Sequence, residues 1–384
     1  MARKSNNRNI FRYTQSYEVS RKRTGIGSII KAILILILIL LLTVSGYFAY
    51  VFFSYERLPD NQNLDIVGTC DNSVIKTGKK NVHHLTSWNI GFGAFTDKFS
   101  FFMDGGTYSR AFSEEETVEN MNRIIYELSS MNPDLMLVQE VDFDSTRSYK
   151  IDQVKMFRDF FSDTYQSTYG MNYNSSYLFY PLLSPIGRSR SGMLTLSKYD
   201  INLAARRSLP IQTDIYKLLD LDRAYTVNRI STSNGKELVL INLHLSAYTT
   251  DATIVKQQLE KIYSTINDEY AKGNYVICGG DFNMDLLSDS ASIFGIPAGE
   301  YSWASPFPED SLPDSVTLYA PLDPENPVPS CRNTDAPWNP DEVFQLTIDG
   351  FMVTNNVKVT KCEVTDLEFK YSDHQPVHLY FTLN

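Results

Sequence analysis

Two short motifs in the C-terminal third of the chain carry the residue types of a phosphate-cleaving site. The first, Gly-Gly-Asp-Phe-Asn-Met-Asp, supplies the carboxylate of Asp281 and the amide of Asn283, two positions apart. The second, Ser-Asp-His-Gln-Pro-Val, supplies the adjacent Asp373 and His374. Cleavage of a phosphate ester needs a metal to polarise the phosphate, a base to activate water, and donors for the developing charge. The two motifs together predict such a site with a divalent metal.

Further polar residues come at or just past short apolar runs, which are typical of buried strands. They are Asn89 after residues 82–88, Gln139 and Glu140 after 135–138, His244 after 238–243, and Asp281 after 275–278; Asp349 lies inside the run 346–353. Strand ends and the loops that follow them converge on one edge of an α/β sandwich. The order of these residues therefore predicts that they meet on one rim.

The same pattern carries a family resemblance over residues 82–384. In chain order it consists of Asn89, Glu140, His244, Asp281, Asn283, Asp349, Asp373 and His374. This order resembles the endonuclease/exonuclease/phosphatase superfamily, which includes pancreatic-type deoxyribonucleases, abasic-site endonucleases, neutral sphingomyelinases and inositol polyphosphate 5-phosphatases. The resemblance implies an α/β fold, a four-layer sandwich in which two packed mixed sheets are flanked by helices. It also implies an enzyme, a metal-dependent phosphoric ester hydrolase.

The expected metal site is made of oxygen ligands, which suit a hard ion such as Mg²⁺ or Mn²⁺. Glu140 is the first candidate ligand, and the resemblance adds Asn89 and Asp373. A lone Glu at a strand end is usually only a solvated residue, but its place in the ordered pattern favours the metal role.

The catalytic roles follow from side-chain chemistry and from the resemblance together. His374 is the expected general base, because its imidazole titrates near neutral pH. The resemblance assigns Asp349 as the partner that orients His374. Asp281 and Asn283 are expected to position the attacking water and one phosphate oxygen, and His244 to donate to another.

Three arginines are candidates for substrate binding. Arg223 opens an expected strand over residues 224–230, where it is either a surface residue or a phosphate contact. Pancreatic-type deoxyribonucleases place an acidic partner for their first catalytic His on a loop between the Gln-Glu motif and that His. The comparable loop here, residues 182–190, has no acid and carries Arg188 and Arg190 instead. This departure argues against a general deoxyribonuclease.

The N-terminus predicts one membrane anchor. Residues 32–53 carry no charge, and 22 residues of helix span about 33 Å, enough to cross a bilayer core. Residues 1–31 hold eight basic residues and one acidic residue, so the positive-inside rule places them in the cytoplasm and the C-terminal domain outside the cell. The alternative is a cleaved signal peptide, although the apolar run is long for one and no Ala-x-Ala site follows. Residues 54–81 are expected to be a polar tether.

Charge separates the two parts of the chain. The basic segment carries +7, so the remainder of a chain with net charge −10 carries −17. An acidic domain binds polyanions weakly, because like charges repel. The charge therefore argues against tight, sequence-independent DNA binding, although a bound metal could still support a nuclease.

Four cysteines do not make a disulfide scaffold. Cys278 is expected to be a buried thiol in the strand before Asp281. One bridge is possible among Cys70, Cys331 and Cys362, with Cys331–Cys362 preferred.

Several elements of the domain are readable. A capping box, Ser113 to Glu116, predicts a helix that ends before Pro133, and Asn234-Gly235 predicts a hairpin turn. A second long helix is expected over residues 254–266. Residues 288–344 form a Pro-rich insertion, either a structureless excursion or a segment that overhangs the site. Its candidates for substrate contact are Trp303, Phe307, Tyr319, Arg332 and Trp338.

The whole pattern predicts a single-pass cell-membrane hydrolase with an extracellular catalytic domain. Its substrate would be a lipid head group or a small phosphodiester, and no obligate protein partner is inferred. Extracellular DNA or RNA is the alternative substrate, because the motifs resemble those of nucleases equally well. A non-catalytic surface-binding module is the remaining alternative. The sequence reveals no exposed hydrophobic hairpin that would favour membrane insertion.

Overall fold

The computed structural model describes residues 25–55, 57–212, 222–247, 252–295 and 303–384. The chain divides into two units, one ending at Tyr50 and the other running from Val51 to Asn384.

The described part of the N-terminal unit is formed by the helix α1, Ile26–Phe53, whose last three residues belong to the second unit. Its large apolar side chains are exposed, and it is long and apolar enough to cross a membrane. The helix begins six residues before the predicted anchor, because Ile26, Ile29 and Ile30 extend the apolar stretch past Lys31. Residues 1–24 of the predicted basic tail lie outside the described residues.

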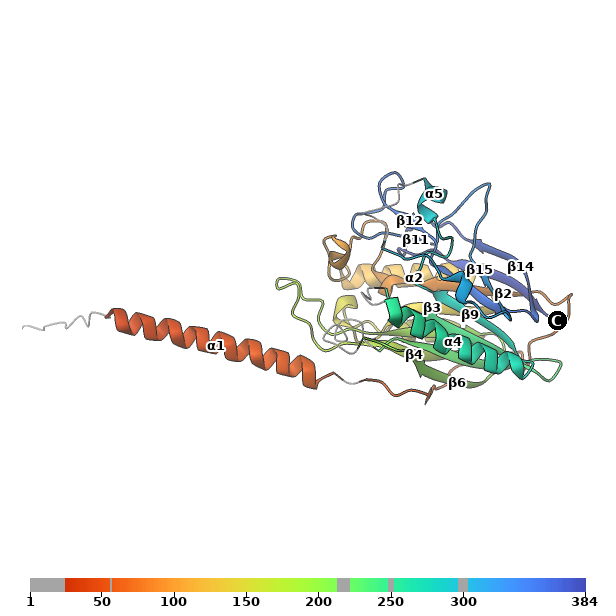
Figure 1. The fold of residues 1–384 in the computed structure, drawn as a ribbon, viewed down its shortest axis with the longest axis horizontal. Helices are drawn as coiled ribbons and strands as arrows, with labels where there is room; N and C mark the ends of the chain where they lie inside the picture. Colours follow the sequence, from red (N-terminus) through yellow and green to blue (C-terminus); the bar gives the residue numbers. More distant parts are fainter. Residues whose placement is uncertain (1–24, 56, 213–221, 248–251, 296–302) are drawn as a thin grey trace, which may run out of the picture. The chain divides into compact units, whose positions relative to one another are not determined.

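The second unit contains two mixed sheets (Figure 1). One has the order β1-β6-β7-β8-β9-β13-β10 and the other β14-β15-β2-β3-β5-β4. The pairs β2–β3 and β8–β9 are parallel, and the remaining pairs within the two sheets are antiparallel. The strands of the first sheet are β1 Gln62–Asn63, β6 Ile201–Ser208, β7 Ala224–Ser231, β8 Glu237–His244, β9 Tyr275–Asp281, β13 Asp349–Thr354 and β10 Val316–Tyr319. Those of the second are β14 Val357–Val364, β15 Val377–Leu383, β2 His83–Asn89, β3 Leu135–Asp142, β5 Arg190–Ser197 and β4 Gln166–Asn174.

Helices cover the outer face of each sheet. The α-helices of this unit are α2 Glu114–Met131, α3 Gln153–Phe161, α4 Ala252–Ala271 and α5 Ser290–Phe294. Alternate residues of β8 divide between two cores, as the period of two in a strand requires. Leu238 and Leu240 pack between the sheets, whereas Val239 and Ile241 pack toward α4. A third core joins the second sheet to α2 and α3. The predicted four-layer α/β sandwich is therefore confirmed.

Local signals in the sequence also match the structure. The Ser113 hydroxyl accepts a hydrogen bond from the Glu116 amide at the start of α2, and Asn132 ends that helix in a left-handed conformation. Gly235, with a φ of 80°, turns the chain between β7 and β8. The second long helix is α4.

The predicted polar tether over residues 54–81 is wrong for most of its length. Strand β1 pairs with β6, Val67 bridges to Ser167, and Ile75 is fully buried between the sheets. Asp60 forms ion pairs with Arg207 and Lys261. The segment is rich in polar residues, which is typical of a linker. In the structure these residues instead form an edge strand and ion pairs, which composition alone does not reveal.

The Pro-rich insertion is partly ordered against the fold. It contributes α5, β10 and β11 (Cys331–Arg332), and β11 pairs with β12 (Gln345–Leu346) directly after the insertion. Residues 296–302 of the insertion lie outside the described residues. The preferred Cys331–Cys362 bridge is wrong, because all four cysteines are free, with Cys331 in β11 and Cys362 in β14. The prediction that Cys278 is a buried thiol is confirmed.

Candidate active site

Strand pairing brings three predicted site residues to one edge of the first sheet. His244 ends β8, Asp281 ends β9, and Asp349 begins β13. The register aligns His244 with Asp281 and Asp281 with Asp349. Asn89 ends β2 in the facing sheet, and its amide donates to Asp281 Oδ2 over 3.0 Å. The predicted rim is therefore assembled from both sheets.

Two glycines before Asp281 allow this close approach. A Cβ atom on Gly280 would lie 2.1 Å from the carbonyl oxygen of Leu243, and the φ of Gly280 is 141°. A Cβ atom on Gly279 would lie 2.4 Å from the ring of Phe351. The Gly-Gly pair thus lets β9 lie tightly between its neighbours and places Asp281 at the rim.

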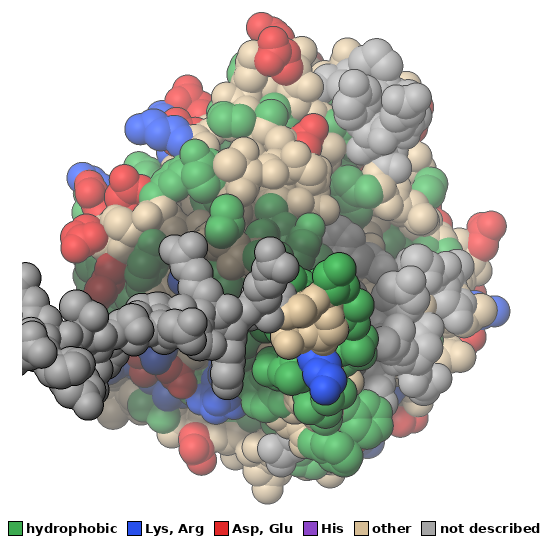
Figure 2. All heavy atoms as spheres, turned by 90° about the vertical axis from the view of Figure 1, so that its left-hand side faces the viewer, with side chains coloured by type: hydrophobic (Ala, Val, Ile, Leu, Met, Phe, Trp, Pro, Cys, Tyr) green, Lys and Arg blue, Asp and Glu red, His purple; other side chains and the backbone are tan. Residues whose placement is uncertain are grey.

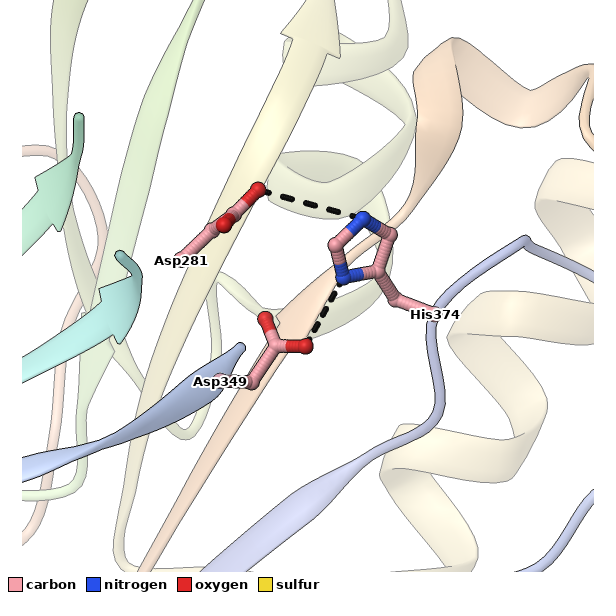
Figure 3. Close-up of side chains that lie close together, drawn as sticks. All are labelled: Asp281, Asp349 and His374. Atoms are coloured by element: carbon pink, nitrogen blue, oxygen red, sulfur yellow. Dashed lines mark hydrogen bonds and ion pairs between the residues drawn. The ribbon is translucent and has the colours of Figure 1, made fainter. Parts of the chain in front are cut away.

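His374 lies between two carboxylates (Figure 3). Its Nδ1 is 2.8 Å from Asp349 Oδ2, and its Nε2 is 3.8 Å from Asp281 Oδ2. The Ser330 hydroxyl also donates to Asp349 Oδ2 over 2.7 Å, which fixes that carboxylate. The indole of Trp88 donates to the carbonyl of His374 over 2.9 Å. Hydrogen bonds therefore fix His374 through both its imidazole ring and its backbone carbonyl.

The surroundings of His374 and Asp281 shift the pKa values of both residues. Burial alone would lower the pKa of His374, but the carboxylates of Asp349 and Asp281 raise it well above its usual range. Burial raises the pKa of Asp281 to about 7, with a further contribution from Asp349 and an opposing one from His374. In this arrangement His374 carries a proton near neutral pH, and Asp281 is poised to accept one.

His244 is a different kind of histidine. Its Nε2 lies 3.4 Å from Asp281 Oδ2, and the side chain is 8% exposed. Burial, reinforced by the positive charges of Arg223, His374 and Arg147, lowers the pKa of His244 well below its usual range. A neutral imidazole retains one N–H donor, which suits the predicted contact with a phosphate oxygen.

The two site amides are held by the backbone. Asn283 donates to the carbonyl of Leu245 over 2.8 Å, and its own N–H donates to Asp281 Oδ1 over 2.9 Å. Asn89 accepts from the Gly91 amide over 3.0 Å, so its NH₂ group points toward Asp281 and, at 3.5 Å, toward Glu140. Asn89 therefore links Asp281 to Glu140, the expected metal ligand.

Glu140 is aimed at the site by a break in β3. The pairing of β3 with β5 shifts register between Val138 and Val141, and Glu140 adopts a φ of 54°. A side chain other than Gly, Asn or Asp rarely takes this conformation, and such strain clusters at functional sites. The bulge turns Glu140 out of the ladder and toward Asn89.

Arg147 is a site residue that the sequence reasoning missed. It makes two hydrogen bonds to Asp142, of 3.0 and 2.9 Å, and its Nη2 lies 3.7 Å from Glu140 Oε2. Its guanidinium lies 3.9 Å from the ring centre of Phe92. Asp142 raises the pKa of Arg147 against the opposing effect of burial, so the cation persists. Its only sequence signal is a position seven residues after Glu140.

These residues open into a cavity of about 640 Å³. Its polar lining includes Glu140, Arg147, Arg223, His244, Asp281, Asn283, Asp373 and His374. Its apolar lining, called the apolar wall below, is formed by Phe92, Phe95, Phe101, Met103, Ile186 and Trp303. The cavity therefore suits a ligand that carries both an anionic group and an apolar or planar group.

Of the three arginines predicted to bind substrate, one lines the cavity and two do not. Arg223 is buried and lines the cavity beside His244. Arg190 pairs with Asp144 over 3.2 Å, Arg188 is exposed, and neither belongs to the cavity lining. Of the insertion candidates, Trp303 and Arg332 line the cavity, whereas Phe307 packs on Phe282, Trp338 packs on Phe369 and Tyr319 lies in β10.

The donor set fits a hard cation at Glu140 and Asp373. Burial and the Glu140 carboxylate raise the pKa of Asp373 to about 6, against the effects of His374 and Arg332. Two carboxylates that disfavour each other's charge in this way are stabilised by a cation, and oxygen donors suit Mg²⁺ or Mn²⁺. Asp281, Asp349 and His374 also cluster within 4.8 Å. There, however, the imidazole proton already serves as the counter-charge.

Comparisons with known proteins agree with this geometry. A model of the Endonuclease/Exonuclease/phosphatase family matches residues 86–374. The chain belongs to this family. The site residues from Asn89 to His374 all lie within the matched span.

Solved structures with a TM-score above 0.5 share the fold. An endonuclease/exonuclease/phosphatase from Beutenbergia cavernae is 17% identical, with a TM-score of 0.53, over 79% of this chain and 72% of that one. ANGEL2, a 2′,3′-cyclic phosphatase in complex with adenosine-2′,3′-vanadate, is 14% identical with a TM-score of 0.52, over 83% and 98%. The human nocturnin catalytic domain with bound sulfate is 15% identical with a TM-score of 0.47, over 84% and 98%. No curated protein matches the sequence.

Proposed function

We propose that this family member is a membrane-anchored, outward-facing phosphodiesterase that requires Mg²⁺ or Mn²⁺ and acts on a lipid head group or a small phosphodiester. The observation that carries the proposal is His374, held at 2.8 Å by Asp349 and facing Asp281 on the polar side of a 640 Å³ cavity. Glu140 and Asp373 would hold the metal, and Asn89, whose NH₂ group faces Glu140 and Asp281, would position the carboxylates around it. When bound, the metal polarises the phosphate and offsets its charge.

The side chains of this protein would perform the proton transfers. Asp281, with its pKa raised to about 7, is matched to take a proton from water near neutral pH. His374, which the sequence predicted as the base, is held protonated and fits better as a donor to a phosphate oxygen. Pairs whose pKa values are driven apart in this way divide the acid and base roles. Neutral His244 and Asn283 would position the phosphate.

The apolar wall supports a substrate larger than phosphate itself. Phe92, Phe95, Phe101 and Trp303 line the same cavity as Asp281 and His374. An acyl-bearing head group fits such a wall by burial of apolar surface. A nucleobase would fit it by stacking, which keeps a nucleotide or RNA end as the second candidate substrate. The ANGEL2 complex with an adenosine vanadate gives that candidate a chemical precedent on the same fold.

The proposed topology rests on charge on either side of the anchor. The eight basic residues before Ala32 would stay in the cytoplasm, which places the −17 remainder outside. The acidic charge of the remainder also disfavours a general duplex-DNA substrate.

A panel assay tests the proposal. Full-length protein in nanodiscs would be given sphingomyelin, glycerophospholipids, a 2′,3′-cyclic nucleotide, RNA, plasmid DNA and a generic phosphodiester, each with Mg²⁺, Mn²⁺ or EDTA. We expect metal-dependent hydrolysis, strongest on a phospholipid or a small diester. Asp281→Asn is the matched inactive control. Greater activity on plasmid DNA than on every small or lipid substrate would reject the proposed substrate class.

A further inference from the structure

The loop between β4 and β5 is an ordered hairpin with an apolar tip, contrary to the sequence-based expectation. Leu178 and Gly187 exchange two backbone hydrogen bonds of 3.1 Å, and the Ser175 amide donates to the Ser189 carbonyl over 2.8 Å. Beyond this ladder the tip exposes Tyr180, Leu182 and Leu183, at 68%, 83% and 102%. Residues 178–187 are called the hairpin tip below. In Figure 1 this yellow-green loop projects beyond the strand ends.

The hairpin tip is supported by contacts with residues 102–110, a segment that also contributes Met103 to the cavity lining. The ring of Phe102 packs on Tyr180 at 5.7 Å between centroids, and the Ser109 hydroxyl donates to the Ser184 carbonyl over 2.5 Å. The Arg110 guanidinium donates to the Pro185 carbonyl over 2.5 Å. Exposed apolar side chains on a supported tip are a fixed feature of the surface, and such patches mark interaction sites.

The tip is continuous with the apolar wall of the active-site cavity. Ile186, on the returning strand of the tip, lines that wall, and its amide donates to the Tyr180 carbonyl over 3.0 Å. Met103, 48% exposed, lies next to Phe102 and also lines the cavity. An apolar path thus leads from the exposed leucines to the catalytic group. Acidic side chains lie mainly toward the margin of the face drawn in the space-filling view (Figure 2).

Chain connectivity indicates which surface would meet this tip. Three residues separate the end of α1 at Phe53 from Arg57, whose guanidinium donates to the Leu209 carbonyl over 2.8 Å. The four steps along the chain from Phe53 to Arg57 reach at most about 14 Å. The Ser54 hydroxyl lies 2.5 Å from that of Ser176 at the base of the hairpin. A membrane crossed by α1 would therefore lie close to the hairpin.

The charge of the hairpin fits the same surface. Residues 175–189 contain no acid, and their one basic residue, Arg188, is exposed behind the apolar tip. An apolar tip followed by a cation matches the layers of a bilayer, where acyl chains lie below anionic phosphates.

We propose that the hairpin tip inserts Leu182 and Leu183 into the outer leaflet of the membrane that holds the anchor, and so turns the active-site mouth toward lipid. The occupant is the acyl region of the bilayer itself. The inference deepens the proposed function, because it favours a substrate drawn from the membrane. Insertion of the tip into the membrane does not itself require that any substrate be cleaved.

Fluorescence quenching tests the insertion directly. Full-length Leu183→Trp protein would be reconstituted in phosphatidylcholine liposomes with and without brominated acyl chains, and the signal of the parent protein subtracted. We expect a blue-shifted emission that loses most of its intensity in brominated lipid. Leu203→Trp is the matched control, since Leu203 is 47% exposed on β6 and should stay unquenched. Equal quenching of the two variants, or none in either, overturns the proposal.

A second arm separates failure of the insertion from failure of the proposed function. Leu182→Ser combined with Leu183→Ser should lower hydrolysis of a membrane-embedded phospholipid and leave that of a water-soluble phosphodiester unchanged. Quenching of Leu183→Trp without any hydrolysis would reject the proposed function alone. Absence of quenching together with cross-linking between copies through the tip would assign this surface to self-association and refute membrane insertion.

Discussion

The Nδ1 atom of His374 lies 2.8 Å from Asp349 Oδ2, a carboxylate that also accepts from Ser330 and whose other oxygen has no hydrogen-bond partner among the described residues. A buried carboxylate of this kind stabilises an imidazolium more than a neutral ring. The Asp349 contact therefore sets both the orientation and the charge of His374, and it leaves Asp281 as the group that can accept a proton.

The division of roles between these residues predicts distinct kinetic defects. Asp281→Asn keeps the shape of the side chain but removes the base, so kcat should fall by at least about 10²-fold. The acid limb of the pH–rate profile, attributed to Asp281, should disappear from the residual activity. His374→Gln should lower kcat comparably but retain that limb. The profiles would be measured on a soluble phosphodiester, and loss of the limb only in His374→Gln would return the base role to His374.

Arg147 is predicted to act on stability as well as on the site. Asp142 is fully buried, so Arg147→Ala would leave its charge without a counter-charge at a cost of about 3–5 kcal/mol in unfolding free energy. Urea unfolding would measure this loss. Arg188→Ala, at an exposed arginine, should change stability by less than about 0.5 kcal/mol. Similar stabilities for the two variants would show that the Arg147–Asp142 pair contributes little.

The lowered pKa of Glu269 predicts that the folded state loses stability as the pH falls. Burial would raise its pKa, but hydrogen bonds from Arg229, Lys272 and Asn274 lower it to about 2. Because the folded-state pKa lies below the ordinary value, the stabilisation is complete above about pH 4.5 and is lost as the pH falls toward about 2. Glu269→Gln should lower stability at pH 7 and flatten its decline across that window. Glu115→Gln, at an exposed position, should leave the pH dependence of unfolding unchanged.

The charge pattern around the anchor predicts the topology in intact cells. Protease added outside should remove the catalytic domain, and a cysteine introduced at Ser5 should resist an impermeant thiol reagent until the cells are opened. The opposite labelling pattern would place the active site in the cytoplasm.

Sequence order predicted the rim residues because strand ends can be read from apolar runs. His244 and Asp281 follow such runs and Asp349 lies inside one, and pairing of β8, β9 and β13 then places them side by side. Arg147 gave no such signal, since it lies in a short 3-10 turn, Thr146–Ser148, whose contact with Glu140 depends on the bulge in β3.

Exposure was the property least accessible from sequence. Ile75 looked like linker but is buried between the sheets, whereas Leu182 and Leu183 looked like ordinary loop residues but are exposed on a braced tip. Burial depends on which segments pack against each other, and no local pattern records it. The same reason explains why Arg188 and Arg190 were expected at the cavity and lie outside its lining.

Metal dependence tests the central claim most directly. Hydrolysis of a soluble phosphodiester by the full-length protein would be followed in EDTA and during Mn²⁺ titration, with binding measured in parallel by calorimetry. We predict no activity in EDTA, full recovery with Mg²⁺ or Mn²⁺, and a severe loss of metal affinity in Glu140→Gln but not in the exposed control Glu115→Gln. Full activity in EDTA, or unchanged metal binding in Glu140→Gln, would contradict the assignment of this site.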